Sequence, residues 1–165
     1  MPRKALLSNP SDLHQIQYLA SFGGPVQWVE VFGSIARGSG GESSDLDVIL
    51  VVDDETASKW AENVIKRLGY FGRAFSNSDF YDSAKHARLD VAAEILGTVP
   101  EAIYLLWYMR NIDIFLFPPD WRDHLDELQR IGRHSDPMFM QNVARDALRY
   151  DPETELLLGP VYTVG

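Results

Sequence analysis

The segment Leu46–Val52 limits the folds open to this chain more than any other stretch. Its sequence, LDVILVV, is almost continuously apolar and rich in β-branched residues, which is typical of a strand buried on both faces. Two further segments, Val26–Phe32 and Ile112–Phe117, are rich in β-branched and aromatic residues and also predict strands. A strand buried on both faces needs covering layers, so we expect a β-sheet flanked by helices.

Helical patterns fill much of the chain between these strands. Residues 11–22 carry apolar side chains at helical spacing and begin with Ser11 and Asp12, either of which can cap a helix. Further helices are expected at residues 53–68, 82–96, 98–110, 120–131 and 137–149. We therefore expect one mixed α/β domain (α+β) in residues 1–150, with a mixed sheet and flanking helices. Residues 151–165 show no clear period and are expected to form a C-terminal tail.

The composition excludes several classes of protein. The chain has 165 residues, the size of one domain, and 45% of them are hydrophobic, which is enough for a core. It has no cysteine, which excludes disulfides, thiolate nucleophiles and cysteine-ligated zinc. No run approaches the ~20 apolar residues of a membrane span, and residues 1–7 lack the apolar stretch of a secretory signal. We expect a cytoplasmic protein that does not bind a membrane.

The net charge argues against a long nucleic acid as a partner. The 24 acidic and 15 basic residues give a formal net charge of −9. A protein that grips long DNA or RNA needs many Lys and Arg side chains against the phosphates. Because no basic cluster is visible in this sequence, we do not expect a polymerase-like enzyme that binds long DNA or RNA.

A Gly-Ser pair ends the predicted strand Val26–Phe32 and begins a short helix. Gly33 lets the backbone approach a phosphate closely, and a helix start presents unpaired N–H groups and the positive end of the helix dipole. Ser34 adds a hydroxyl donor, and Arg37, one turn later, either reaches the same phosphates or pairs with a nearby acid. The segment is a candidate phosphate-binding turn, although a capped turn without a ligand has the same local sequence.

Two aspartates, Asp45 and Asp47, lie at the start of the buried strand. Side chains at positions i and i+2 of a strand share a face, about 6.6 Å apart, so these two carboxylates repel each other and lose hydration. A divalent cation compensates for both effects, and all-oxygen ligation suits Mg²⁺. Together with the phosphate-binding turn, the pair predicts a site for a metal–nucleoside triphosphate.

These residues resemble a known signature. Gly33-Ser34, ten intervening residues and Asp45-x-Asp47 are similar to the motif of the DNA polymerase β-type nucleotidyltransferase superfamily. More narrowly, GSIARG followed by SDLDV resembles the minimal nucleotidyltransferases, small proteins often paired with a helical partner protein in prokaryotic toxin–antitoxin operons. The sharp match covers residues 31–52. The resemblance implies a polymerase β-like core and a nucleotidyltransferase activity.

The resemblance also implies a third carboxylate on a nearby strand, for which there are two candidates. Asp113 lies in the predicted strand Ile112–Phe117, which contains a single acid. Asp90 has apolar neighbours of the same kind, but its surroundings favour a helix, in which it would be a solvated surface residue. We therefore prefer Asp113 as the third carboxylate.

The mechanism implied by the resemblance uses Mg²⁺ and a nucleoside triphosphate, most simply ATP. In this scheme Asp45, Asp47 and Asp113 hold one or two Mg²⁺ ions, and Gly33 and Ser34 bind the β- and γ-phosphates. An acceptor hydroxyl attacks the α-phosphorus, pyrophosphate leaves, and Asp113 takes the acceptor proton.

The residues do not name the acceptor. In the minimal members of the family it can be a partner protein, which implies an antitoxin that nucleotidylates its helical toxin. The apolar helices expected after Thr98 are compatible with a surface for a partner or a homodimer, and equally with a place in the core. A second interpretation is transfer to a small molecule, as in the aminoglycoside nucleotidyltransferases. A third is a catalytically silent binding module of the same fold.

Overall fold

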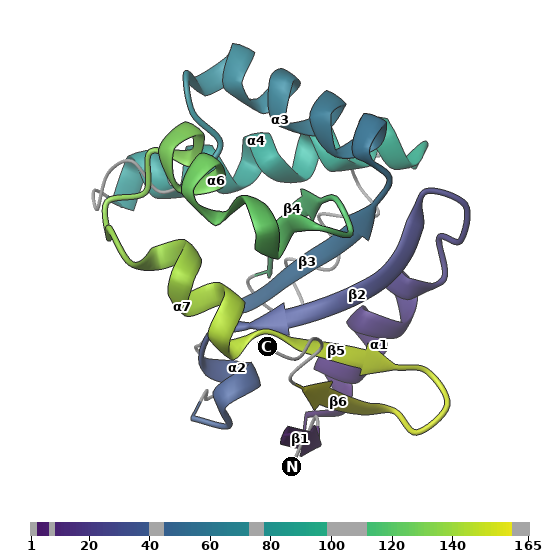
Figure 1. Ribbon diagram of the computed structural model, residues 1–165. Helices are drawn as coiled ribbons and strands as arrows, with labels where there is room; N and C mark the ends of the chain where they lie inside the picture. Colours follow the sequence, from purple (N-terminus) through teal and green to yellow (C-terminus); the bar gives the residue numbers. More distant parts are fainter. Residues whose placement is uncertain (1–2, 7–8, 40–44, 73–77, 99–111, 160–165) are drawn as a thin grey trace.

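The computed structural model describes residues 3–6, 9–39, 45–72, 78–98 and 112–159. In these residues the chain forms six strands: β1 (Arg3–Leu6), β2 (Val26–Phe32), β3 (Leu46–Val52), β4 (Ile112–Phe117), β5 (Leu148–Asp151) and β6 (Leu156–Gly159). They build one mixed sheet with the order β1-β6-β5-β2-β3-β4 (Figure 1). β3 and β4 run parallel, and the other neighbouring pairs are antiparallel. The mixed α/β fold class predicted from the sequence is confirmed.

β3 lies inside the sheet between β2 and β4, and all seven of its residues are buried, as its apolar sequence predicts. The bounds of β2, β3 and β4 are those of the three predicted strands. The register pairs Phe32 with Asp47 and Asp47 with Asp113. The last residue of β2 and the first residues of β3 and β4 therefore lie side by side at one end of the strands, where the predicted site residues are.

Helices cover the sheet. The longer ones are α1 (Pro10–Ala20), α3 (Asp54–Leu68), α4 (Ser78–Leu96), α6 (Leu125–Gly132) and α7 (Phe139–Asp146); the short ones are α2 (Gly33–Arg37) and the 3-10 helix η1 (Trp121–His124). α3 and α4 pack against each other and both contact β4, whereas α1 contacts β2 and α7 contacts α2 (Figure 1). Among the described residues, no helix has the length and apolar character needed to cross a membrane.

Local signals explain where α3 begins and ends. The side chain of Asp53 accepts a hydrogen bond from the backbone N–H of Thr56 at 2.8 Å, which caps the first turn. Gly69, with φ at +82°, ends the helix in the left-handed conformation that glycine adopts without strain. The sequence analysis expected this helix at residues 53–68, within one residue of its observed start.

Aromatic rings join α3 to β4 in the core. The ring centroid of Trp60 lies 5.5 Å from that of Phe71 and 6.0 Å from that of Phe115. All three side chains are fully buried, and each such burial stabilises the fold by about 1.5–3 kcal/mol. This packing holds the α3–α4 layer firmly against the strand that carries Asp113.

The C-terminal residues differ from the prediction. The helix expected at residues 137–149 ends at Asp146, because Leu148–Asp151 forms β5 and pairs with β2. The proposed boundary at residue 150 falls inside β5, and Leu156–Gly159 forms β6 between β5 and β1. The edge of β2 that faces away from β3 has backbone groups that need partners, and β5 supplies them. The sheet therefore extends to residue 159, into the segment expected to be a tail.

Other differences are smaller. α1 is capped by Asn9, whose side chain accepts from the N–H of Ser11 at 2.9 Å, so neither Ser11 nor Asp12 is the cap. α4 begins at Ser78, earlier than expected, and β1 was not predicted. Almost all of the helix expected at residues 98–110 lies outside the described residues.

Candidate functional site

A cavity of about 410 Å³ opens at the sheet edge where β2 ends and β3 begins. It is lined by five of the six residues that the sequence analysis assigned to the site, namely Gly33, Ser34, Arg37, Asp45 and Asp47. Further lining residues come from α7 and the segment before it, among them Asp136, Asn142 and Asp146. The fold thus brings the Gly-Ser turn and the aspartate pair to one space.

Gly33 makes a close approach that requires a glycine. Its φ is +76°, in the left-handed region, and a Cβ at this position would overlap Oδ2 of Asp47. The backbone therefore passes directly against a carboxylate of the cavity. α2 begins at Gly33, so the N–H groups of its first turn, including that of Ser34, have no acceptor within the helix. Such donors can bind an anion such as a phosphate.

Asp45 and Asp47 line the same cavity but differ in exposure. The side chain of Asp45 is 23% exposed, whereas Asp47 is 8% exposed. Oδ2 of Asp45 accepts a hydrogen bond from Nζ of Lys85, on α4, at 2.5 Å. This ammonium group compensates part of the repulsion between the two carboxylates.

Asp113 lies beside Asp47 across the parallel pair β3–β4 and is fully buried. Arg88 of α4 donates to it twice, from Nε to Oδ1 and from Nη2 to Oδ2, both at 2.8 Å. Nη1 of Arg88 also donates to the carbonyl oxygens of Phe71 and Gly72, at 2.9 and 3.2 Å. Asp113 is not among the residues that line the cavity. The preferred third carboxylate is therefore adjacent to the aspartate pair but is held by a guanidinium in the interior.

Asp90, the alternative third carboxylate, lies on α4, in the helical setting that its sequence favours. Its Oδ2 is 3.9 Å from Nη1 of Arg67, on α3, and Nη2 of Arg67 contacts Glu94 at 2.7 Å. These half-exposed groups form a surface network between α3 and α4. Neither Asp90 nor Asp113 lines the cavity, but Asp113 is paired in register with Asp47, so it is the better placed of the two candidates.

In the part of the chain that the structure describes, no three His, Asp or Glu side chains converge in an arrangement that could hold a metal ion. Asp45 contacts Lys85, and Asp113 contacts Arg88. The donor set nevertheless fits Mg²⁺, which usually binds one or two carboxylates together with substrate phosphates. Asp45 and Asp47 supply two carboxylates beside a turn that can bind phosphates.

Arg37 lies at the rim of the cavity and pairs with an acid. Its Nη1 is 3.3 Å from Oδ2 of Asp146, on α7. Asp146 also accepts two hydrogen bonds from Arg145, at 2.9 and 3.2 Å. The hydrogen bond from Arg145 is the largest of the effects that lower the pKa of Asp146 below its ordinary value, whereas burial acts in the opposite direction. The sequence left two roles open for Arg37, a contact with phosphates or an ion pair with a nearby acid. In the structure Arg37 forms the ion pair, with Asp146.

The sequence analysis missed the site residues that α4 and α7 contribute. Lys85 and Arg88 are almost fully buried, which is rare for these residue types unless they are paired. Their position in a stretch rich in alanine was a signal that could have identified them. Asn142 and Asp146, four residues apart on α7, share a helix face that lines the cavity. No local pattern indicates that this face meets Gly33.

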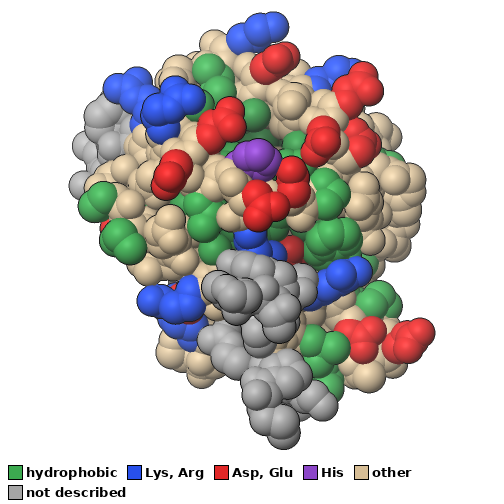
Figure 2. Space-filling view, viewed as in Figure 1, with side chains coloured by type: hydrophobic (Ala, Val, Ile, Leu, Met, Phe, Trp, Pro, Cys, Tyr) green, Lys and Arg blue, Asp and Glu red, His purple; other side chains and the backbone are tan. Residues whose placement is uncertain are grey.

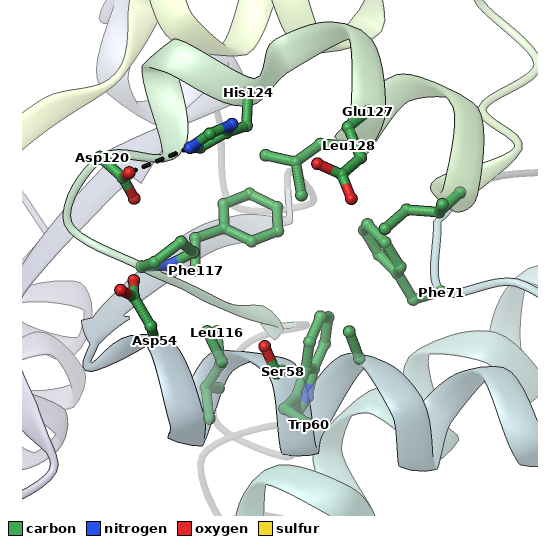
Figure 3. A pocket seen from close by; sticks show the side chains of 14 residues that line it. Asp54, Ser58, Trp60, Phe71, Leu116, Phe117, Asp120, His124, Glu127 and Leu128 are labelled. Atoms are coloured by element: carbon green, nitrogen blue, oxygen red, sulfur yellow. Dashed lines mark hydrogen bonds and ion pairs between the residues drawn. The ribbon is translucent and has the colours of Figure 1, made fainter.

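A second cavity, of about 260 Å³, lies between α3, the end of β4 and α6 (Figure 3). Rings from the core form much of its wall: Trp60, Phe71 and Phe117. Acidic side chains gather in the upper half of the face shown in Figure 2, where α3 and α6 lie. Two that line the cavity, Asp54 and Glu127, lie in the first turns of α3 and α6, where carboxylates stabilise a helix. No predicted site residue lines this cavity.

Residues 15–95 match the model of a family described as a nucleotidyltransferase domain. The matched segment includes the Gly33-Ser34 turn, Asp45, Asp47 and most of α4. No curated protein and no solved structure matches the chain significantly. Residues 15–95 are therefore identified as a nucleotidyltransferase domain, consistent with the DNA polymerase β-type superfamily that the motif resembles.

Proposed function

We propose that this protein transfers a nucleoside monophosphate from a nucleoside triphosphate, most simply ATP, to a hydroxyl acceptor with the help of Mg²⁺. One observation carries the proposal: the Gly33-Ser34 turn and the carboxylates of Asp45 and Asp47 line one cavity of about 410 Å³. A triphosphate is an anion that needs N–H donors, and its metal needs oxygen ligands. The cavity offers both.

Each group of the cavity has a role in this scheme. The N–H groups at the start of α2 and the hydroxyl of Ser34 bind the β- and γ-phosphates. Asp45 and Asp47 would hold Mg²⁺, which when bound neutralises the charge of the phosphates. The acceptor oxygen forms a bond to the α-phosphorus as the bond to the bridging oxygen breaks, and pyrophosphate leaves with the electron pair. The hydroxyl proton of the acceptor passes to solvent water at the open cavity in the same reaction.

Asp113 remains the third carboxylate of the proposal, with a modified role. Each carboxylate oxygen accepts from Arg88 but has further acceptor capacity. The register places Asp113 beside Asp47, so the ion pair that Asp113 forms with Arg88 lies in the interior next to a carboxylate that is proposed to hold the metal. Direct contact of Asp113 with a metal ion or with the acceptor proton would require a rearrangement of the buried pair.

The size of the cavity favours an acceptor that approaches from outside. A volume of about 410 Å³ is near the lower end of ordinary ligand pockets, which span roughly 300–1,000 Å³. A nucleoside triphosphate would occupy most of this space, so a hydroxyl on the surface of a partner protein is the acceptor that we propose. In this proposal the chain is an antitoxin and its helical toxin is the modified partner.

A second candidate acceptor is a small cationic molecule such as an aminoglycoside. The observation that favours it is that Asp136 lines the same cavity as Asp45 and Asp47. An amino group on a small acceptor would pair with the carboxylate of Asp136.

The test is transfer of label from α-³²P-labelled nucleoside triphosphates in the presence of Mg²⁺, with cell lysate and with any protein encoded beside this one. We expect a labelled protein band with the wild type and at least a hundredfold less label with Asp47→Asn. A labelled small molecule in place of the band would favour the second acceptor. Absence of label with all four nucleotides would contradict the proposed activity and leave a silent binding module.

A further inference from the structure

α4 places two buried cations against two acids of the candidate site. The side chains of Lys85 and Arg88 are 5% and 1% exposed, and residues three apart on a helix share a face. Lys85 reaches Asp45, and Arg88 reaches Asp113. Both cations come from one helix, but the two ion pairs differ in how firmly they are held.

The pair formed by Arg88 is fixed. Its guanidinium donates twice to Asp113 and twice to backbone carbonyl oxygens, and it lies over the ring of Phe115 at 4.9 Å from the centroid. Asp113 is 0% exposed. A planar group with four hydrogen bonds and a ring contact has one favourable position, so this pair is a permanent part of the core.

The pair formed by Lys85 lies at the cavity. Its partner, Asp45, lines the space where the metal and the triphosphate are proposed to bind. An ammonium group is a compact charge on a flexible stem, and it can change position without breaking a planar array. A divalent cation bound to Asp45 would bring a second positive charge to a carboxylate oxygen that already accepts from Nζ at 2.5 Å. The two positive charges cannot occupy this position together without strong repulsion.

We propose that Lys85 is a displaceable counter-ion of Asp45. It neutralises this carboxylate while no divalent cation is bound, and binding of the cation to Asp45 and Asp47 displaces the ammonium group. The inference rests on the proposed function only in that these two aspartates hold a divalent cation. Its consequence is that Lys85 sets the concentration of metal at which the site fills, and that α4 responds to metal binding.

Because Lys85 and the metal ion compete for Asp45, the direction in which a mutation of Lys85 changes the metal affinity can be predicted. If metal binding displaces Lys85, removal of the lysine charge must strengthen metal binding. A lysine with a structural role alone would give the opposite result or no change, because loss of a buried pair loosens the site.

The first experiment is a calorimetric titration of the full-length protein with Mn²⁺ alone, as a probe for Mg²⁺. We expect Lys85→Gln to bind Mn²⁺ about tenfold more tightly than the wild type, which corresponds to about 1.4 kcal/mol. Lys85→Arg, which keeps the charge, should stay within threefold of the wild type. Lys66→Gln, which removes an exposed lysine of α3, is the matched control and should bind as the wild type does.

The outcomes separate the two proposals. Unchanged or weaker Mn²⁺ binding by Lys85→Gln, with wild-type binding that depends on Asp47, would overturn the role of Lys85 and leave the proposed function standing. Absence of Mn²⁺ binding in both the wild type and Lys85→Gln would overturn the metal site and, with it, the inference.

A second experiment uses the wild type and does not depend on the folding of a Lys85 variant. The sequence contains four lysines, Lys4, Lys59, Lys66 and Lys85, so acetylation of each can be followed by mass spectrometry. We expect saturating Mg²⁺ to raise the acetylation rate of Lys85 at least threefold and to leave the exposed Lys59 and Lys66 unchanged. An unchanged rate at Lys85 under metal-binding conditions would overturn the displacement.

Discussion

Replacement of Asp113 by asparagine tests the buried ion pair beside the cavity. Asparagine keeps the shape of the side chain but removes the charge that faces Arg88, whose Nη2 lies 2.8 Å from Oδ2 in a pair with almost no exposure. The guanidinium would then be buried without its counter-charge, which costs about 3–5 kcal/mol. Typical domains are stable by roughly 5–15 kcal/mol. We expect Asp113→Asn to lower the free energy of unfolding by about 3 kcal/mol or more.

The assay is urea unfolding followed by tryptophan fluorescence, because Trp60 packs against Phe115 on the strand that carries Asp113. Asp47→Asn is the matched control, since Asp47 is the register neighbour of Asp113 and contacts the cavity. Removal of the Asp47 charge relieves its repulsion with Asp45, so we expect the free energy of unfolding to change by no more than about 1 kcal/mol. Both variants should lose transfer activity, but Asp113→Asn alone should unfold more easily.

A double variant completes the experiment. Arg88→Met combined with Asp113→Leu removes both charges and should recover part of the lost stability, because apolar residues can replace a buried ion pair. The recovery is partial, since the carbonyl oxygens of Phe71 and Gly72 lose their donor. Stability of Asp113→Asn within about 1 kcal/mol of the wild type would refute the assignment of a firmly held charge pair.

Two further predictions concern the rim of the cavity. Gly33→Ala should lower stability by about 1–2 kcal/mol through backbone strain and should also reduce transfer at least tenfold, because the new Cβ overlaps Oδ2 of Asp47. Gly38→Ala has a similar φ of +78° with open space around the Cβ, so in the same unfolding and transfer assays it should lose stability alone. The pKa of Asp146, measured by NMR titration, should lie below its ordinary value and rise in Arg145→Ala. Because the folded pKa of Asp146 lies below its unfolded value of about 3.8, ionised Asp146 stabilises the fold above that pH, and this stabilisation is lost as the pH falls through the folded pKa. In Arg145→Ala, the free energy of unfolding should therefore fall less steeply with decreasing pH in this range.

The residues of the motif and the strands β2, β3 and β4 were predictable from local sequence. Leu46–Val52 is almost continuously apolar. Such a segment favours a strand in the interior of a sheet that is covered on both faces. Gly33 follows the last residue of β2 and begins α2, as the Gly-Ser pair in the sequence predicted. The fold class and the juxtaposition of the Gly-Ser turn with the aspartates follow from these local features and their spacing. The metal, the nucleotide and the acceptor stay predictions.

The short strands at the end of the chain were not predictable in the same way. β5 and β6 have four residues each, too few to show a clear period of two. Leu148–Asp151 is a strand because β2 needs a neighbour at its other edge, which is a property of the sheet and not of the segment. The sequence predicted a helix through residue 149 because helix propensity is a local property and carries no information about pairing with β2, which is distant in sequence.

The charges around the aspartates were likewise decided by tertiary structure. Lys85 is 40 residues from Asp45 in sequence, and Arg88 is 25 residues from Asp113. Sequence alone determined that α4 is a helix and that acids lie on β3 and β4, because helix propensity and hydrophobic pattern depend on residues that are close in sequence. Which face of α4 meets the sheet depends on how α3, α4 and β4 pack together, and that packing alone brought each cation to its carboxylate.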